Sequence, residues 1–196
     1  KPTEHILNRY SEINLSQWKL LELGKLTREE VLVRRYEILF QEVGMSCDAK
    51  KISEKYEDFL GEGHYFIPGA KELLEDLSKK YHLYLASNGA VKVQMSRIQS
   101  AGIEKYLEKI FLSEQIGYEK PSPQFFEKCF AQIPNFKKEE ALILGDSLTS
   151  DIRGGKNAGI LTVWFHPSGK KVEEEIVPDY EIGKLEELKT ILSFYS

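Results

Sequence analysis

Residues 141–159, ALILGDSLTSDIRGGKNAG, place two aspartates five positions apart, directly after a short apolar run. The run is typical of a buried strand, and the segment that follows it is typical of a helix. A carboxylate at such a junction can cap the helix or bind a cation. Thr149 and Ser150 already offer capping hydroxyls, and the carboxylates of Asp146 and Asp151 repel each other unless a cation offsets their charge. The pair therefore favours a site for a divalent metal ion.

The chain on either side of this stretch, from residue 64 onward, alternates between strand-like and helical segments. Apolar runs predict strands at residues 82–87, 109–113, 141–145, 162–165 and 179–182. Helical periodicity predicts helices at residues 70–80, 91–102, 122–133, 149–158 and 184–193. This alternation predicts an α/β fold, a Rossmann-like parallel sheet with helices on both faces.

Residues 1–63 have a different texture, because apolar residues recur there only at helical spacing. Thr27 followed by Glu30 is a capping-box pattern that predicts the start of a helix, and Gly44 is typical of its end. A third helix is expected to end near Gly61. The sequence therefore predicts a separate α-helical cap domain over residues 1–63, with the α/β core over residues 64–196.

Composition narrows the class of protein. The 196 residues are 41% hydrophobic, which is enough for a real core, and the net charge of −4 gives no reason to expect nucleic acid or an anionic membrane as partner. No apolar run reaches the roughly 20 residues that span a bilayer. Cys47 and Cys129 form neither a metal-binding spacing nor a disulfide framework, which suits the reducing cytoplasm, and both are expected to be buried.

Polar residues that follow the predicted strands are the candidates for a site, because ligands of open α/β sheets bind beyond the carboxyl ends of the strands. Ser87, Asn88 and Gly89 offer a hydroxyl, an amide and backbone N–H groups at the start of a helix, which can bind an anion or simply cap the helix. Pro121 keeps Lys120 out of helical geometry, so that its ammonium group can point over the sheet edge. An anion site, a fixed cation and a metal site together are what phosphoryl transfer needs.

These segments carry a family resemblance. IPGAKELLEDL (67–77), LASNG (85–89), GYEKPSP (117–123) and LILGDSLTSDIRGGKNAG (142–159) resemble, in order and spacing, the later motifs of the haloacid dehalogenase-like superfamily of phosphohydrolases. The whole chain looks closest to the pyrimidine 5′-nucleotidase branch, in which a helical cap covers the active site.

The resemblance implies a role for each candidate residue. Ser87 would hydrogen-bond the phosphoryl oxygens, in a phosphate pocket that Asn88 and Gly89 help to form. Lys120 would neutralise negative charge on the phosphoryl group. Asp146 would coordinate Mg²⁺, and Asp151 would act beside it, as a second ligand, through water or by holding Lys120. The implied reaction is hydrolysis of a small phosphorylated metabolite, a pyrimidine nucleoside 5′-monophosphate or else a sugar phosphate, through an aspartyl-phosphate.

One part of the family pattern has no counterpart in these residues. The nucleophilic aspartate of the family lies in a D-x-D motif after the first strand, and none of the six aspartates of this sequence forms one. We expect that the chain is a piece of a longer protein whose core begins with that strand, and that the 196 residues alone are inactive.

Other functions fit the sequence less well. A haloacid dehalogenase needs no metal and so no pair of aspartates, a response-regulator receiver carries its acidic pair early in the chain, and the P-loop pattern is absent. A non-catalytic relative that binds a phosphorylated ligand remains open. Five further residues could have functional roles, but we expect simpler explanations. We expect His166 to be a solvated loop residue and Trp18 to pack in the core. Three arginines of the predicted cap are expected on a solvated helix face: Arg28, Arg34 and Arg35.

Overall fold

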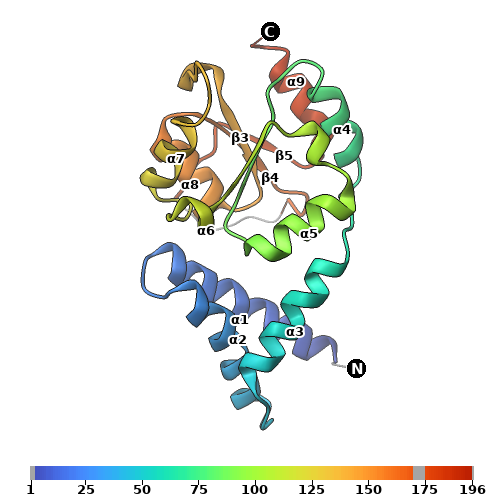
Figure 1. Cartoon of the computed structure of the whole chain (residues 1–196), viewed down its shortest axis with the longest axis vertical. Helices are drawn as coiled ribbons and strands as arrows, with labels where there is room; N and C mark the ends of the chain where they lie inside the picture. Colours follow the sequence, from blue (N-terminus) through green and yellow to red (C-terminus); the bar gives the residue numbers. More distant parts are fainter. Residues whose placement is uncertain (1–2, 170–174, 196) are drawn as a thin grey trace. The chain divides into compact units, whose positions relative to one another are not determined.

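The computed structural model describes residues 3–169 and 175–195. The chain divides into two compact units, Lys1–Gly63 and His64–Ser196. The N-terminal unit, blue to cyan in Figure 1, consists of the helices α1 (Glu4–Glu22), α2 (Arg28–Glu42) and α3 (Ala49–Glu62). None of the helices in the described part of the chain combines the length and apolar character that a membrane-spanning segment needs.

The ends of α2 are set by the residues that the sequence indicated. The N–H of Thr27 donates to Oε2 of Glu30 over 2.7 Å, and the N–H of Glu30 donates to Oγ1 of Thr27 over 3.3 Å. These two bonds satisfy backbone donors that the first turn of a helix leaves without partners, which confirms the predicted capping box. Gly44 follows the helix with a φ of +67°, the left-handed conformation that glycine adopts most readily.

A buried arginine lies inside the N-terminal unit. Arg35 of α2 is 3% exposed. Its Nη1 donates to Oδ1 of Asn14 over 2.9 Å, and its Nη2 lies 3.1 Å from Oε1 of Glu57. The rings of Tyr36 and Tyr56 lie beneath the guanidinium group, about 5 Å away. The expectation of a solvated helix face is therefore wrong for Arg35, because these partners offset the cost of burying its charge.

The C-terminal unit alternates strands and helices along the chain. Its strands are β1 (Tyr84–Ser87), β2 (Lys109–Leu112), β3 (Leu142–Gly145), β4 (Leu161–Phe165) and β5 (Tyr180–Ile182). Its α-helices are α4 (Ala70–Leu77), α5 (Val91–Ala101), α6 (Ser113–Ile116), α7 (Pro123–Phe130), α8 (Arg153–Ala158) and α9 (Leu188–Leu192). Each predicted strand and helix is present, most of them shorter by a few residues.

The strands form two parallel ladders. β1 pairs with β2, and β4 lies between β3 and β5. The registers place Ser87 opposite Leu112 and Gly145 opposite Trp164. Among the residues that the structure describes, no hydrogen-bonded ladder joins β1 to β3. The α/β fold with parallel strands is as the sequence predicted.

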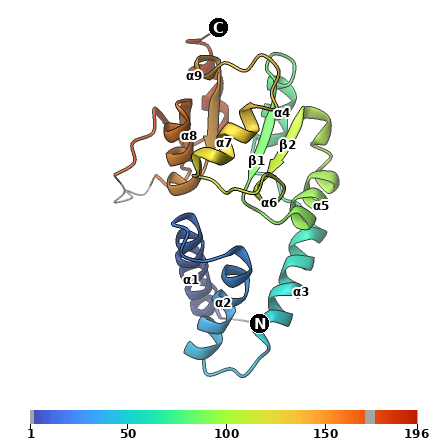
Figure 2. The same ribbon diagram turned by 60° about the vertical axis from the view of Figure 1, so that its left-hand side comes forward.

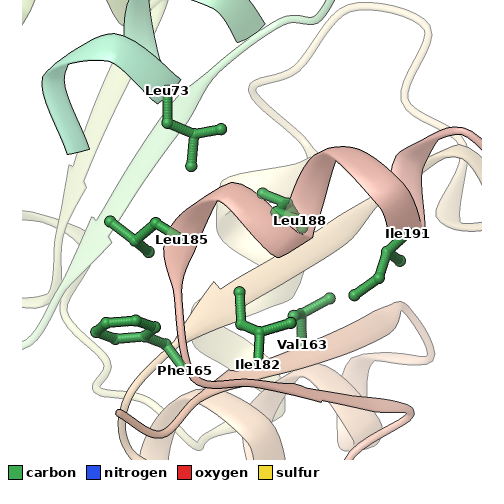
Figure 3. Packing of buried hydrophobic residues seen from close by; sticks show 7 residues of the cluster. All are labelled: Leu73, Val163, Phe165, Ile182, Leu185, Leu188 and Ile191. Carbon is green, nitrogen blue, oxygen red and sulfur yellow. The ribbon is translucent and has the colours of Figure 1, made fainter. Parts of the chain in front are cut away.

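Successive side chains of β3 point to opposite faces of the strand, and helices pack on both faces. Leu142 and Leu144 contribute to one apolar cluster and Ile143 to another. Figure 3 shows the first cluster, in which Leu73 of α4 and two residues of the chain's last helical segment, Leu188 and Ile191, pack against the side chains of β4 and β5.

The second cluster is built on α7 and α8, which lie side by side (Figure 2). Phe125 and Phe126 of α7 contribute to it together with Ala158 of α8. Phe125 is fully buried, which contributes roughly 1.5–3 kcal/mol relative to an exposed side chain. Helices therefore cover the sheet from both faces, as in other α/β proteins.

The helix predicted at residues 149–158 begins with an unusual turn. Residues Leu148–Ile152 form a π-helical turn, and α8 starts only at Arg153. The carbonyl of Ser147 accepts hydrogen bonds from the N–H groups of both Asp151 and Ile152, over 2.9 and 3.1 Å. The second of these bonds spans five residues, which widens the turn. Such single π-turns are often found at functional sites.

Candidate active site

The predicted site residues meet where β1 and β3 end. Ser87 is the last residue of β1, and Asp146 directly follows β3. Lys120 comes from the loop between α6 and α7, and its side chain is 8% exposed. Its Nζ donates to the carbonyl of Ala86 over 2.7 Å and to Oδ1 of Asp151 over 2.6 Å. The lysine thus points inward, and it joins the end of β1 to the turn that follows β3.

Asn88 fixes the backbone of Lys120. Its Nδ2 donates to the carbonyl of Lys120, and the N–H of Lys120 donates back to its Oδ1, both over 2.9 Å. This reciprocal pair holds two loops, 32 residues apart in the chain, in one register. The Asn88 side chain therefore shapes the site through Lys120, and a direct contact between Asn88 and phosphate stays a prediction.

Asp151 is the buried member of the aspartate pair. The residue is 7% exposed, and while its Oδ1 faces Lys120, its Oδ2 accepts the N–H of Ser147 over 3.1 Å. Both carboxylate oxygens therefore have partners in the chain itself. Asp151 lies in the π-helical turn, and its side chain packs against Gly145. A Cβ atom at position 145 would overlap the Asp151 side chain.

Asp146 differs from its neighbour in every respect. It is exposed, and its carboxylate has no hydrogen bond or ion pair to any residue in the ranges 3–169 and 175–195. Its backbone is nevertheless held, because Nε1 of Trp164 donates to its carbonyl over 3.0 Å. The site thus combines one open carboxylate with a buried lysine–aspartate pair. The described residues contain no cluster of three or more histidine, cysteine, aspartate or glutamate side chains that could hold a metal. A metal ion bound to Asp146 would therefore need further ligands of other kinds.

Two backbone N–H groups at the start of α5 already donate hydrogen bonds to side chains of this chain. The N–H of Gly89 donates to Oγ of Ser87 over 3.0 Å, and the N–H of Val91 donates to Oε2 of Glu114 over 2.9 Å. The N–H of Gly89 is therefore already bonded within the chain, and a contact between Gly89 and phosphate stays a prediction. Glu114 follows β2, and nothing in the local sequence pairs it with a helix that begins 23 residues earlier.

Three side chains outside the central set depart from expectation. His166 is not a solvated loop residue, since its ring stacks on Trp164 at 4.0 Å between centroids. Its Nδ1 lies 2.9 Å from Oε1 of Glu181. Trp18 is half-buried rather than in the core, with the guanidinium group of Arg28 5.9 Å from its ring centre. Cys47 is exposed, whereas Cys129 is buried as predicted.

The family model for haloacid dehalogenase-like hydrolases matches residues 1–165, which include every residue of this site. The chain belongs to the haloacid dehalogenase-like hydrolase family. This confirms the resemblance drawn from the motifs at the strand ends.

Several named proteins are similar to this chain in sequence over most of its length. YfnB of Bacillus subtilis, named as a HAD-hydrolase, is 41% identical over 97% of this chain and 81% of its own length. The pyrimidine 5′-nucleotidase PynA of Streptococcus pneumoniae is 37% identical over 91% of this chain and 76% of its own. The pyrimidine 5′-nucleotidase YjjG of Escherichia coli is 27% identical over 93% of this chain and 80% of its own.

A solved structure of YfnB, bound to magnesium, matches 98% of this chain and 84% of its own with a TM-score of 0.93 and 40% identity. The α/β fold with parallel strands is thus that of a haloacid dehalogenase-like hydrolase.

Proposed function

We propose that this hydrolase cleaves phosphomonoesters with Mg²⁺ as cofactor, and that its substrate is a pyrimidine nucleoside 5′-monophosphate. The observation that carries the proposal is that an open carboxylate, Asp146, directly follows β3, and that the buried ammonium group of Lys120 is held nearby in the chain's fold by Asp151 and by the carbonyl of Ala86 in β1. A phosphoryl group needs a cation and a fixed positive charge around its oxygens, and both would be at hand here. The names of PynA and YjjG support the choice of substrate.

The residues present fit a magnesium ion. Mg²⁺ prefers oxygen ligands and is commonly bound by one or two carboxylates together with substrate phosphate and water. Asp146 offers such a carboxylate without a competing partner in the described chain, whereas both oxygens of Asp151 are engaged. We therefore assign Asp146 as the direct ligand and Asp151 as the residue that holds Lys120. When bound, the ion would offset negative charge on the phosphoryl oxygens.

The remaining residues orient and neutralise the substrate. Ser87 would donate its hydroxyl proton to a phosphoryl oxygen. Lys120 would face the same group with its ammonium charge, held in place by Ala86 and Asp151. The route through an aspartyl-phosphate belongs to the proposal as well: an aspartate carboxylate attacks phosphorus, the bond from phosphorus to the ester oxygen breaks, and the alcohol leaves after taking up a proton. Water then hydrolyses the acyl phosphate to inorganic phosphate and restores the carboxylate. Neither Asp146 nor Asp151 is assigned the attack, because each already has a role.

The helical unit of residues 1–63 is proposed to act as the cap that selects the substrate. Hydrolysis of uridine, cytidine and adenosine 5′-monophosphates by the full-length gene product, with and without Mg²⁺, tests the substrate assignment. We expect Mg²⁺-stimulated release of phosphate, with the pyrimidine nucleotides preferred. Equal rates for the adenine nucleotide would contradict the substrate class while leaving the phosphatase assignment intact.

The metal assignment has its own test. Asp146→Asn removes the charge with almost no change in volume and should abolish the Mg²⁺-stimulated rate, a loss of at least about 10²-fold, as for other groups that stabilise a transition state electrostatically. Asp76→Asn on α4 is a matched control, since Asp76 pairs with Lys189 on the surface. Full Mg²⁺-stimulated activity of Asp146→Asn would refute the assignment.

A further inference from the structure

Ser87 has a hydrogen-bonding environment that settles the direction of its hydroxyl proton. Its Oγ accepts the N–H of Gly89 over 3.0 Å and Nε2 of Gln94 over 2.9 Å. A serine hydroxyl offers one proton and two lone pairs. Both lone pairs are thus used within the chain, and the proton is left to donate to a third group.

Gln94 reaches Ser87 because of the glycine between them. It lies in the first turn of α5, seven residues after Ser87 in the chain. A Cβ atom at position 89 would overlap the Gln94 amide. The Ser87–Asn88–Gly89 segment therefore leaves space for one specific side chain, and that side chain presents a donor to the Ser87 oxygen.

A phosphoryl oxygen accepts hydrogen bonds and cannot donate one when it is ionised. A serine that binds it must therefore act as donor, and a hydroxyl that is free to rotate loses part of its affinity by adopting other orientations. We propose that Gln94 is a positioning residue, which fixes the Ser87 hydroxyl as a donor toward a phosphoryl oxygen. This inference rests on the proposed phosphatase function and extends it to a residue that has no contact of its own with the phosphate.

The test compares two replacements of Gln94 in the full-length protein. Gln94→Glu keeps the size of the side chain, but its ionised carboxylate only accepts hydrogen bonds and would draw the Ser87 proton away from the phosphate. Gln94→Leu removes the donor without reversing its polarity. Inorganic phosphate in the presence of Mg²⁺ serves as the probe, and its inhibition constant is measured against p-nitrophenyl phosphate hydrolysis.

We expect the inhibition constant for phosphate to rise about tenfold in Gln94→Glu and by a smaller factor in Gln94→Leu, as for the loss of a hydrogen bond to a charged group. Gln99→Glu is the matched control, since it makes the same change at an exposed position of the same helix and should leave the constant unchanged. Thermal unfolding identifies any variant that has lost its fold.

A double-mutant cycle separates positioning from general structural damage. If Gln94 acts through Ser87, then Gln94→Glu should weaken phosphate binding much less in a Ser87→Ala background than in the wild type. An equal effect in both backgrounds, or wild-type phosphate affinity in Gln94→Glu, would overturn the inference. A wild-type protein that binds no phosphate would instead overturn the proposed function, and this inference with it.

Discussion

Lys120 shows at the scale of a single residue how the site is held. Its ammonium group is buried, and a buried charge is tolerated only where partners replace the lost water. The Ala86 carbonyl and the Asp151 carboxylate are those partners, and the Asp151 side chain is itself only 10% exposed. Removing one partner of such a pair typically costs about 3–5 kcal/mol, because the other charge stays buried alone. Asp151 is therefore needed to keep the charged side chain of Lys120 buried, whether or not it also contacts a bound metal or phosphate.

A glycine provides the space for this pair, and it allows a prediction. Gly145→Ala should displace Asp151, because the new Cβ would overlap the side-chain carbon atoms of Asp151. We expect a loss of about 1–3 kcal/mol in the free energy of unfolding, measured by urea denaturation. Gly183→Ala makes the same substitution where the nearest atom to the new Cβ is Oε1 of Glu187, at 4.0 Å, and it should be close to neutral. Equal stability of both variants would show that the turn adapts to the added methyl group.

The sequence could predict where the candidate site residues lie in the fold, but not the contacts among them. Strand ends are visible as breaks in apolar runs, so Ser87, Lys120 and Asp146 could be placed at one edge of a sheet. The bonds that Asn88 makes to Lys120, and the bond from Trp164 to Asp146, join residues that are 32 and 18 positions apart. No local pattern encodes such pairs, because they depend on how the elements pack.

At the scale of elements, Asp179 links the end of the chain to the sheet. Its Oδ1 lies 2.5 Å from Nζ of Lys156 in α8, and its Oδ2 accepts both the N–H and the hydroxyl of Thr162 in β4, over 2.8 and 2.7 Å. Thr162 is fully buried. These bonds fix where β5 starts beside β4.

The same contacts make stability depend on pH. Partial burial would raise the pKa of Asp179, but the hydrogen bonds from Lys156 and Thr162 outweigh it and hold the pKa below its ordinary value. Because the folded-state pKa is the lower one, the stabilisation is fully present above the unfolded pKa of about 3.9 and is lost as the pH falls through the folded pKa. Asp179→Asn should therefore lower the melting temperature at pH 7, and the difference from wild type should shrink below about pH 4. A difference that stays constant down to pH 3 would contradict this account.

Elements were predictable where periodicity was strong and less so where hydrogen bonds override it. The capping box at Thr27 and the stop at Gly44 are local signals, and both are present as expected. The π-helical turn Leu148–Ile152 was not predictable, because it arises when one carbonyl, that of Ser147, accepts two N–H groups. Arg35 was expected on a solvated face because its partner Glu57 lies 22 residues away, on another helix.

At the scale of the whole molecule, each unit carries one thiol, and the two differ in accessibility. Cys47 of the N-terminal unit is exposed, and Cys129 of the C-terminal unit is 4% exposed. Burial raises the pKa of the Cys129 thiol to about 12, although the charge of Lys120 acts in the opposite direction. Since the thiolate is the reactive form, Cys129 should be inert while the C-terminal unit is folded.

Thiol labelling therefore reports on each unit separately. In native protein at pH 8 we expect one equivalent of a thiol reagent to react quickly, and the second only when denaturant opens the C-terminal unit. Cys47→Ser should remove the fast reaction completely. Rapid labelling of that variant under native conditions would mean that the cluster around Phe125 and Phe126 opens readily.

The two reciprocal hydrogen bonds between Asn88 and the Lys120 backbone also affect deamidation of Asn88. Asn88 precedes a glycine, and an asparagine–glycine pair in a mobile chain readily loses ammonia as the next backbone nitrogen attacks the side-chain amide. Here that nitrogen donates to Ser87, while the amide is held on the Lys120 backbone from both sides. The attacking atom and its target are therefore kept in other bonds, which protects the amide during storage. Conversion to aspartate would place a carboxylate against the Lys120 carbonyl, so the same bonds that fix the loop also preserve the residue on which they depend.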